Sequence, residues 1–385
     1  MKILLIHNNY RSKLIGGEDL VFNREFDALV ELLGKDNVFR YEEFNDNITF
    51  MSLLKNIFFS RRHKQNVFEL IKKNKIDIVH VHNFFPLLST SIFKAAKQAG
   101  AKVVHTLHNY RWWCIGGILY REKAGICEKC VKKSFNWEGV KFGCYRNSKI
   151  QSLLAAIAFY NFKRLGAFKD IDYFFALTKF QKEKLMEFKM PEEKIVIKFN
   201  FNAGNIDEFI DYQDKSGFVF IGRLEESKGI VDLIEAWRKI NKKLVIIGDG
   251  PLKDYVKKNI TENIEYLGNL KNHQVKKKLK RSKYLIQLSK SYETFGLTII
   301  EAFQMGTPVI GLDIGTRKDF IIDGFNGYLM QDISELKTII QKADQCEYYE
   351  KIVGNSLCTA KEYSKHTIIN SQIALYENII RGEKF

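Results

Sequence analysis

The sequence predicts two α/β domains, each a doubly wound parallel sheet with helices on both faces. One observation behind this prediction is a rhythm of short apolar runs separated by longer helical stretches, which is typical of buried parallel strands and crossover helices. Another is that the rhythm pauses near residues 199–215 and then restarts. A third is the length, because 385 residues exceed what one hydrophobic core usually serves. Two Rossmann-like domains are therefore expected to face each other across a ligand-binding cleft.

The apolar runs give the expected positions of the strands. Strands of the first domain are predicted at residues 2–6, 38–41, 76–81, 101–107 and 171–177. Strands of the second domain are predicted at residues 217–221, 244–247, 264–267, 284–288 and 309–312. We therefore expect a first domain at 1–203, with a cysteine-rich insertion at 112–146, and a second domain at 204–363.

No stretch of the chain predicts a membrane span or a signal peptide. The apolar start at residues 1–6 is too short for a signal sequence and is predicted to be a buried first strand. The longest mostly apolar run, residues 153–162, is about half of a membrane span. We therefore expect a cytoplasmic protein.

The net charge of +16 predicts an anionic partner. Nucleic acid, nucleotide sugars and an anionic bilayer all fit that description. Two basic clusters lie at residues 58–64 and 276–281. The first has aromatic residues beside its basic ones, as segments that seek an anionic membrane surface do. Either cluster could instead be a solvated face.

Residues 291–310 are predicted to form a loop, a helix, a turn and a buried strand. The turn at Phe295, Gly296 and Leu297 leaves backbone N–H groups unpaired at the positive end of the helix dipole. A phosphate is a natural ligand there. Glu293 before the turn and Glu301 within the helix could hold hydroxyl groups on either side of that phosphate, or could be solvated acids.

The first strand of the second domain ends in Gly222, which lets the backbone turn sharply. Arg223 and Lys228 follow in that turn, at the strand's carboxyl end. Two cations at this position can neutralise a diphosphate. The alternative is a surface turn with ordinary charges.

The glutamate pair resembles the E-x7-E signature of the retaining glycosyltransferases of family four, which have the GT-B fold. The Gly-Arg and Lys-Gly pairs within residues 222–229 are similar to the diphosphate-binding element of that family. The resemblance implies that Glu293 lies against the transferred sugar and Glu301 grips the ribose. It also implies that Arg223 and Lys228 hold the diphosphate.

The same resemblance extends to other segments of the second domain. Asn269 and Leu270 correspond to the stretch that lines the nucleotide base, which suggests contacts from their backbone. Residues 248–251 also look like the family, where they lie behind the nucleotide, and no ligand is assigned to them. The resemblance implies in addition that the last helix, residues 364–380, crosses back onto the first domain.

In the first domain, Gly16 and Gly17 follow the first strand and open a helix, so a phosphate or an acceptor could approach its N-terminus closely. The family usually has one residue between such glycines and an acid. Here Glu18 follows directly, so no role is assigned to it. His108 matches the strand-end histidine of the family that reaches the donor sugar, and it ranks above His105 as a functional residue.

Two more histidines lie in and directly after the third predicted strand. A lone histidine in a strand is more often structural than catalytic. His80 and His82 are predicted to point to opposite faces of the sheet, where either could be a core side chain.

Four cysteines, Cys114, Cys127, Cys130 and Cys144, cluster within the insertion. In a reducing compartment such a set favours structural Zn²⁺ over disulfides. Only the middle pair has a tight metal spacing, so reduced thiols and a redox disulfide remain alternatives. A subset of similar enzymes carries a comparable insertion.

The predicted function is retaining transfer of a sugar from a nucleotide diphosphate donor, expected to be UDP-linked, to a hydroxyl of a lipid-linked or polysaccharide acceptor. Catalysis is expected to need no cofactor and no divalent metal. The Asp170–Asp172 pair enters a strand at its amino end, so it cannot serve as a metal clamp. Peripheral association with the inner face of an anionic membrane is expected to accompany this activity.

Three alternative functions differ from this one in what they require of the sequence or the product. A nucleotide-sugar epimerase on the same fold would isomerise its substrate rather than transfer it. A nucleic-acid-binding protein is suggested only by the charge, and no recognition motif supports it, so no nucleic-acid partner is expected. A Rossmann oxidoreductase would need a G-x-G-x-x-G motif after the first strand, which this chain lacks.

Overall fold

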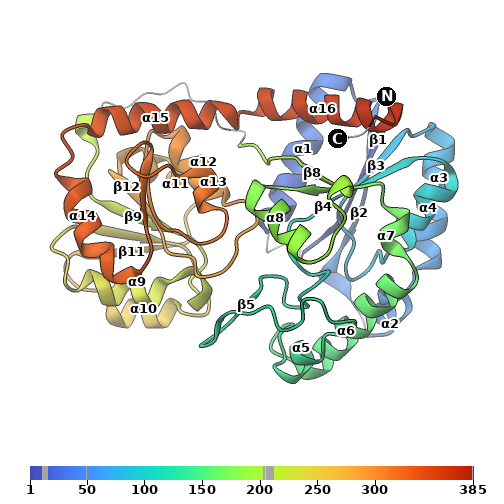
Figure 1. Cartoon of the computed structure of the whole chain (residues 1–385), viewed down its shortest axis with the longest axis horizontal. Coiled ribbons are helices and arrows are strands. Elements are labelled where there is room, and N and C mark those ends of the chain that lie inside the picture. The colour runs from blue at the N-terminus through green and yellow to red at the C-terminus, as the bar shows by residue number, and fades with distance from the viewer. Residues whose placement is uncertain (11–15, 49, 203, 205–211, 384) are drawn as a thin grey trace. The chain divides into compact units, whose positions relative to one another are not determined.

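The structure, a computed structural model, describes residues 1–10, 16–48, 50–202, 204, 212–383 and 385. The chain forms two compact units, whose elements are labelled in Figure 1. Unit 1 comprises residues 1–117, 128–200 and 365–385, and unit 2 comprises residues 118–127 and 201–364. Each unit is a parallel sheet with flanking helices, so the prediction of two Rossmann-like α/β domains is confirmed.

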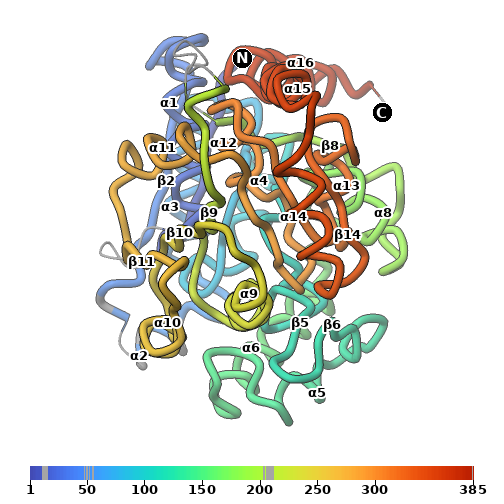
Figure 2. The backbone as a smooth tube through the Cα atoms, turned by 90° about the vertical axis from the view of Figure 1, so that its left-hand side faces the viewer, coloured from blue at the N-terminus to red at the C-terminus, as the bar shows by residue number. Residues whose placement is uncertain are grey.

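Unit 1 contains a six-stranded sheet in the order β2-β1-β3-β4-β7-β8. Its strands are β1 (Ile3–Asn9), β2 (Val38–Phe44), β3 (Ile78–Asn83), β4 (Lys102–Thr106), β7 (Tyr173–Ala176) and β8 (Ile195–Ile197). Its α-helices are α1 (Gly17–Leu33), α2 (Phe50–Ile57), α3 (Arg61–Asn74), α4 (Ser91–Ala99), α5 (Trp137–Lys141), α6 (Lys149–Arg164), α7 (Ala167–Asp170), α8 (Lys179–Glu187) and α16 (Lys365–Arg381). Helices α3 and α4 pack side by side, as do α5 and α6; the α5–α6 pair is labelled in Figure 2.

Unit 2 contains a second six-stranded sheet in the order β11-β10-β9-β12-β13-β14. Its strands are β9 (Phe218–Ile221), β10 (Leu244–Ile247), β11 (Ile264–Gly268), β12 (Tyr284–Gln287), β13 (Val309–Leu312) and β14 (Gly327–Met330). Its α-helices are α9 (Ile230–Trp237), α10 (Lys253–Asn259), α11 (Asn272–Arg281), α12 (Leu297–Gln304), α13 (Arg317–Phe320), α14 (Leu336–Asp344) and α15 (Tyr349–Glu362). A short hairpin, β5 (Tyr120–Arg121) with β6 (Gly125–Ile126), also belongs to this unit.

The strand orders determine where ligands can approach each sheet. In unit 2 the chain builds outward from β9 in one direction and then returns to add β12 on its other side. In unit 1 the same reversal separates β2 from β3 around β1. In open α/β sheets, ligands bind at such reversal points, beside the carboxyl ends of the strands. The loops that follow β9 and β12 in unit 2, and β1 and β3 in unit 1, are therefore the places to search.

Three features of the architecture differ from the predicted one. The edge strands β8 and β14 were not predicted. Residues 118–127 of the insertion, expected in the first domain, are grouped with unit 2. The contact boundary falls between Asn200 and Phe201, whereas residues 203 and 205–211 of the expected junction lie outside the described residues.

The last helix of the chain belongs to unit 1. Helix α16, Lys365–Arg381, is grouped with unit 1, the domain onto which the resemblance had it crossing back. Within the described residues, no helix is long and apolar enough to cross a membrane.

Candidate functional site

The loops after β9 and β12 of unit 2 meet through an ion pair. The Lys228 ammonium lies 2.6 Å from the Glu293 carboxylate (Nζ to Oε1). The Ser289 hydroxyl donates to the same oxygen at 2.5 Å. The Lys228 and Glu293 side chains keep 30% and 12% of their exposure, so the pair is only partly closed off from solvent. Two of the predicted site residues therefore lie in direct contact.

Backbone contacts hold these two loops in register. The Lys290 N–H donates to the Ser227 carbonyl at 2.7 Å. Gly229 has a φ of 73°, and a Cβ built there would lie 2.3 Å from the Leu288 carbonyl oxygen. Because only glycine permits so close an approach, the glycine of the Lys-Gly pair serves the loop packing. Lys228 is thus positioned by its immediate neighbour.

Arg317, at the start of α13, is a site residue that the sequence analysis missed. Its side chain is buried and donates to the Leu312 carbonyl from Nε and to the Ser289 carbonyl from Nη2, each at 2.5 Å. Its Nη1 atom has no hydrogen-bond partner among the described residues. The only sequence signal for it was its position shortly after the buried strand β13.

The electrostatics of this group favour an ionised Glu293. Burial alone would raise the pKa of its carboxyl, but the Lys228 ammonium and the Arg317 guanidinium, together with the hydrogen bonds from Lys228 and Ser289, lower it to about 2. Two cations therefore face one carboxylate. A further anion could be accommodated there without leaving either cation unbalanced.

Arg223 and the N-terminus of α12 lie in the same set of strand-end loops. The Arg223 side chain is 66% exposed and pairs with Glu225 at 3.1 Å (Nε to Oε2). Gly296 is the N-cap of α12, with a φ of 88° in the left-handed region that favours glycine, and the helix starts at Leu297. Glu301 lies within that helix and is half-buried.

The loops after β10 and β11 contribute packing and an outer position. A Cβ at Gly248 would lie 1.9 Å from the Gly222 carbonyl oxygen, so the loop after β10 packs directly against the turn that carries Arg223. This packing explains the glycine without a ligand. Asn269 and Leu270 follow β11, the edge strand two places from β9, and Asn269 is exposed.

The β5–β6 hairpin contacts the loop between Arg223 and Lys228, which the sequence analysis did not anticipate. The Tyr120 hydroxyl donates to Glu226 Oε1 at 3.0 Å, and the Lys123 N–H donates to the same oxygen at 2.8 Å. Burial, together with the hydrogen bond to Glu226, raises the pKa of Tyr120. No sequence signal could have revealed this contact, because the partners are 106 positions apart.

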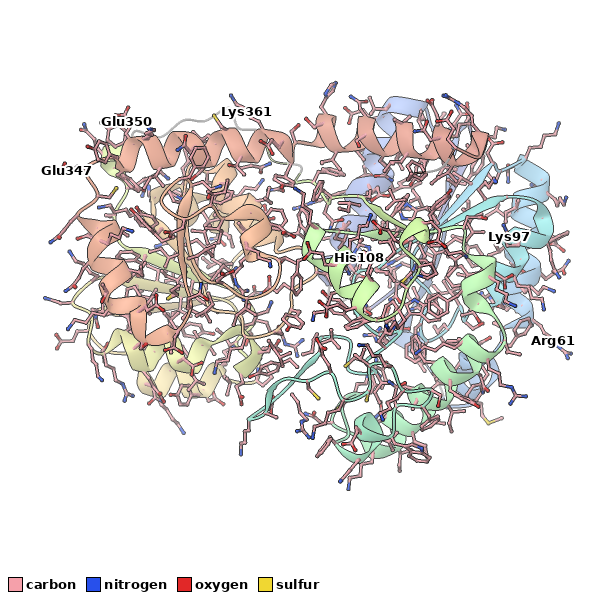
Figure 3. The ribbon with its side chains drawn as sticks, in the orientation of Figure 1. Arg61, Lys97, His108, Glu347, Glu350 and Lys361 are labelled. Carbon is pink, nitrogen blue, oxygen red and sulfur yellow. The ribbon has the colours of Figure 1, made fainter. Side chains whose placement is uncertain are left out.

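His108 of unit 1 follows β4 and is labelled in Figure 3. Its Nε2 lies 2.9 Å from Nδ1 of His82, whose own Nε2 lies 3.3 Å from Glu25 Oε1. Burial, with the nearby charges of His82 and Lys198, lowers the pKa of His108 well below its usual range, so the ring is neutral.

His105, the lower-ranked histidine, is a core side chain. Its Nδ1 bonds to the Val81 carbonyl at 2.8 Å, and its ring packs among Phe84, Phe93 and Trp112. Burial lowers its pKa to about 4.

A buried charge network fills the reversal point of unit 1. The Glu25 carboxylate pairs with Lys198, accepts from Gln372 of α16 and lies 3.0 Å from Nδ1 of His80. Burial alone would raise the pKa of Glu25, but Lys198, His82 and His80 lower it well below its usual range. Every charge in this network meets its partner inside the unit.

The prediction that His80 and His82 point to opposite faces was wrong. Both rings reach Glu25, and their centroids are 4.3 Å apart. The reason is that side chains two residues apart on a strand share a face. Among the described residues, Glu25, His80 and His82 are the one group of three His, Cys, Asp or Glu side chains whose possible metal-ligand atoms all lie within 4.8 Å of one another. The Lys198 ammonium already supplies the positive charge there.

The N-terminus of α1 is closed by its own side chains. Gly16 is its N-cap and Gly17 its first residue, and the Gly16 N–H donates to Asp19 Oδ2 at 2.8 Å. The other Asp19 oxygen lies 2.7 Å from Nε2 of His7. Glu18 accepts from the Asn109 side chain at 2.7 Å. A ligand at Gly16 and Gly17 would therefore meet an already capped helix.

The four clustered cysteines do not form a compact ligand set within the described residues. They contribute to no group of three ligand atoms within 4.8 Å. Cys114 and Cys144 flank Gly116, and Cys130 lies beside Gly139, all in unit 1. Cys127 is grouped with unit 2. None of the four forms a disulfide in the part of the chain that the structure describes.

Comparison with protein families gives matches to both halves of the chain. Residues 204–351 match the family described as glycosyl transferases group 1. Residues 33–201 match the family described as glycosyltransferase family 4. The first match covers the sheet of unit 2 with its strand-end loops, and the second covers strands β2 to β8 of the unit 1 sheet but not β1.

Individual curated relatives share 30% or 25% of their aligned residues with this chain. An uncharacterised glycosyltransferase of Methanocaldococcus jannaschii is 30% identical over 200 residues, which are 50% of this chain and 55% of that protein. The chain thus spans about half the length of this curated relative. The alpha-monoglucosyldiacylglycerol synthase of Acholeplasma laidlawii is 25% identical over 325 residues, 80% of this chain and 77% of that protein.

Among solved structures, the Anabaena protein HepE in complex with UDP has a similar fold. It superposes with a TM-score of 0.67 at 18% identity, over 97% of this chain and 98% of that one. At this identity the likeness concerns the fold alone.

Proposed function

Because the chain belongs to the glycosyltransferases of group 1 and family 4, we propose that it transfers a hexosyl group from a UDP-sugar, with retention, to a hydroxyl of a lipid-linked or polysaccharide acceptor. One observation carries the proposal. Lys228, Arg317 and Glu293 converge beside the N-terminus of α12, at the reversal point of the sheet in unit 2. The Anabaena neighbour has been solved with UDP and with UDP-glucose, which supports a uridine donor.

The chemistry asked of this site is departure of a diphosphate. The bond between the sugar C1 and the diphosphate oxygen breaks, and the acceptor oxygen bonds to C1 on the same face. The acceptor proton passes to the departing phosphate oxygen. Charge develops on the diphosphate, so Arg223, Lys228 and the N–H groups of Phe295, Gly296 and Leu297 would stabilise the transition state. In this proposal the diphosphate displaces Glu293 from Lys228 and leaves that carboxylate for the sugar.

The two glutamates and His108 have separate proposed roles. Glu293 faces the sugar, and Glu301 of α12 holds the ribose. His108, kept neutral in its buried setting, would reach the donor sugar. Asn269 and Leu270 would contact the base through their backbone.

The test is product analysis by mass spectrometry after incubation with a panel of nucleotide sugars and lipid-linked acceptors. A new glycoside supports transfer, whereas an isomerised donor would indicate the epimerase. Glu293→Gln should reduce turnover far more than it weakens UDP binding, and Glu301→Gln should weaken UDP binding first. Calorimetry showing the reverse order would overturn the assignment of the two roles.

Structural zinc and membrane association are separate parts of the proposal. One zinc per chain, measured by plasma emission, would support the cysteine site, and a zinc-free active protein would remove it. Residues 58–64 span the N-terminal cap of α3, where Arg61 and Arg62 are exposed and Phe58 and Phe59 are half-buried. Sedimentation with anionic vesicles that weakens with salt would support a peripheral location.

A further inference from the structure

Unit 1 contains a pocket of about 360 Å³ that lies away from the carboxyl ends of its strands. It lies between the end of α6, the start of α7, strand β7 and the loop after α8. This volume is within the usual range for small-molecule sites. None of the residues so far assigned to the donor lines it.

The floor of this pocket is aromatic. Trp113, Phe174 and Phe188 are buried, and Phe168 joins them. The ring of Trp113 lies 5.7 Å from that of Phe188 and 6.3 Å from that of Phe168, centroid to centroid. These rings pack tilted against one another, which leaves hydrocarbon surface facing the space. A chain of methylene groups is the natural occupant of such a floor.

The remaining polar lining consists of lysine side chains alone. Six lysines line the pocket, and no acidic, amide or hydroxyl side chain does: Lys132, Lys133, Lys163, Lys169, Lys189 and Lys194. Among the described residues, none of the six lies within 4.0 Å of a carboxylate. Six cations around one opening repel one another and attract an anion, and the Asp172 and Glu193 carboxylates offset this only in part, by opposing the lowering of the Lys194 pKa.

Two of these lysines are partly withdrawn from water. Burial lowers the pKa of Lys163, in the last turn of α6, to about 8, and no carboxylate opposes the effect. The Lys194 ammonium donates to the carbonyls of Phe168 and Ile171, at 2.9 and 2.8 Å. An anionic group bound between them would give Lys163 the negative partner that no carboxylate provides, and would add to the partial compensation that Lys194 receives from Asp172 and Glu193.

We infer that this pocket binds a lipid phosphate, with the alkyl or isoprenoid chain on the aromatic floor and the phosphate among the lysines. A nucleotide fits less well, because a base edge would find no amide, hydroxyl or carboxylate side chain to bond. A neutral lipid would leave the lysines unmatched. The inference is independent of the proposed function, since it concerns binding alone.

Titration calorimetry on the full chain tests the inference with soluble probes below their micelle concentrations. Hexyl, octyl and decyl phosphate should bind one site, with affinity rising at least fivefold from hexyl to decyl. Inorganic phosphate, uridine monophosphate and octyl glucoside should bind at least tenfold more weakly than octyl phosphate. Any of these three binding as tightly as octyl phosphate would overturn the inference, as would affinity that ignores chain length.

Variants locate the site. Lys132→Gln with Lys133→Gln should weaken octyl phosphate at least tenfold, and both side chains are exposed, so the fold should not suffer. Lys72→Gln with Lys73→Gln removes the same charge from exposed positions on α3 and should change nothing. Equal loss in both pairs would indicate a general effect of charge and would reject the pocket. A separate titration with anionic vesicles distinguishes a bilayer lipid from a free one. Octyl phosphate should compete with the vesicles for the protein only if the pocket takes up a lipid from the bilayer.

Discussion

Each unit has a group of charged side chains at the reversal point of its sheet, and the two groups are built differently. In unit 1, Glu25 and Lys198 are both buried, and the carboxylate is matched on the spot by lysine, glutamine and histidine. In unit 2, Glu293 faces Lys228 and Arg317 and keeps some exposure. The first group is neutralised and closed, whereas the second has spare positive charge and an opening.

The elements that carry these groups differ as well. Glu25 comes from a helix and His80 from a strand, both packed in the interior of unit 1. Lys228 and Glu293 come from loops whose backbones are tied together. Charge balance, more than the type of side chain, thus separates a structural group from one that can exchange its partner for a ligand.

The largest effect is expected from breaking the buried ion pair of Glu25 and Lys198 in unit 1. Lys198→Met should leave Glu25 buried without its cation and should lower the free energy of unfolding of unit 1 by about 3 to 5 kcal/mol. Hydrogen exchange on peptides of unit 1 measures this. The double variant Glu25→Gln with Lys198→Met should recover much of the loss, and no recovery would mean that the pair is not the source of the stability.

The second largest effect is expected from acid, which should lower the stability of unit 1 more than that of unit 2. Seven of the eight histidines lie in unit 1, and only His273 lies in unit 2. Burial lowers the pKa of His82 to about 3 and that of His105 to about 4. Because the unfolded chain takes up protons below pH 6.5 and these folded rings do not, their stabilising contribution is full above pH 6.5 and falls as the pH drops toward those values.

At pH 5 each of these two histidines should cost unit 1 roughly 2 kcal/mol. Hydrogen exchange at pH 7 and pH 5, corrected for the intrinsic rate, compares the units directly. Unit 2 should change little. Equal destabilisation of both units would contradict the assignment of these histidines to a neutral core.

Substitutions of the cations at the strand-end loops of unit 2 should change catalysis rather than stability. Arg223→Ala or Lys228→Ala should cost about 2 to 4 kcal/mol in transition-state stabilisation, measured as kcat/KM. Lys351→Ala, an exposed charge on α15, is the matched control and should have no effect.

The same experiment bears on the metal question. Brief EDTA treatment should leave the activity unchanged while zinc content is monitored alongside. Activity lost at constant zinc and restored by Mg²⁺ or Mn²⁺ would mean that a metal, and not Arg223 and Lys228, balances the diphosphate.

The smallest effect is expected from the β5–β6 hairpin, which contacts the loop between Arg223 and Lys228. Tyr120→Phe removes one of the two donors that hold Glu226 in place, so UDP should bind about 0.5 to 1.5 kcal/mol more weakly. Calorimetry measures the change, and Tyr348→Phe, at a position 72% exposed, is the control. An unchanged affinity in Tyr120→Phe would show that the hairpin does not position the loop.

Much of the fold could be predicted from the sequence because buried parallel strands leave apolar runs. The strands β10 and β13 were predicted with their observed bounds, and β1 was predicted to end three residues too early because His7, Asn8 and Asn9 are polar yet buried. The edge strands β8 and β14 were missed. Three or four residues at the margin of a sheet carry too little periodicity to stand out.

The site was predictable where turn chemistry is local. Glycine beside charged residues at the end of a strand marked Arg223 and Lys228, and the turn before α12 marked Glu293. Arg317 and Tyr120 carried no such mark. Arg317 contacts the Ser289 carbonyl and Tyr120 contacts Glu226, both from distant positions in the sequence, and a single arginine or tyrosine has no periodicity that would indicate such a contact.

By itself, then, the sequence determined the two α/β units, the strand-end turns and the acids and bases on them, because burial period and turn preference are properties of neighbouring residues. Only the tertiary structure decided which charges meet. Lys198 reaches Glu25 across 173 positions, and Lys228 reaches Glu293 across 65. Such pairings depend on distance and burial in space, so the same residue types became a closed structural group in one unit and an open site in the other.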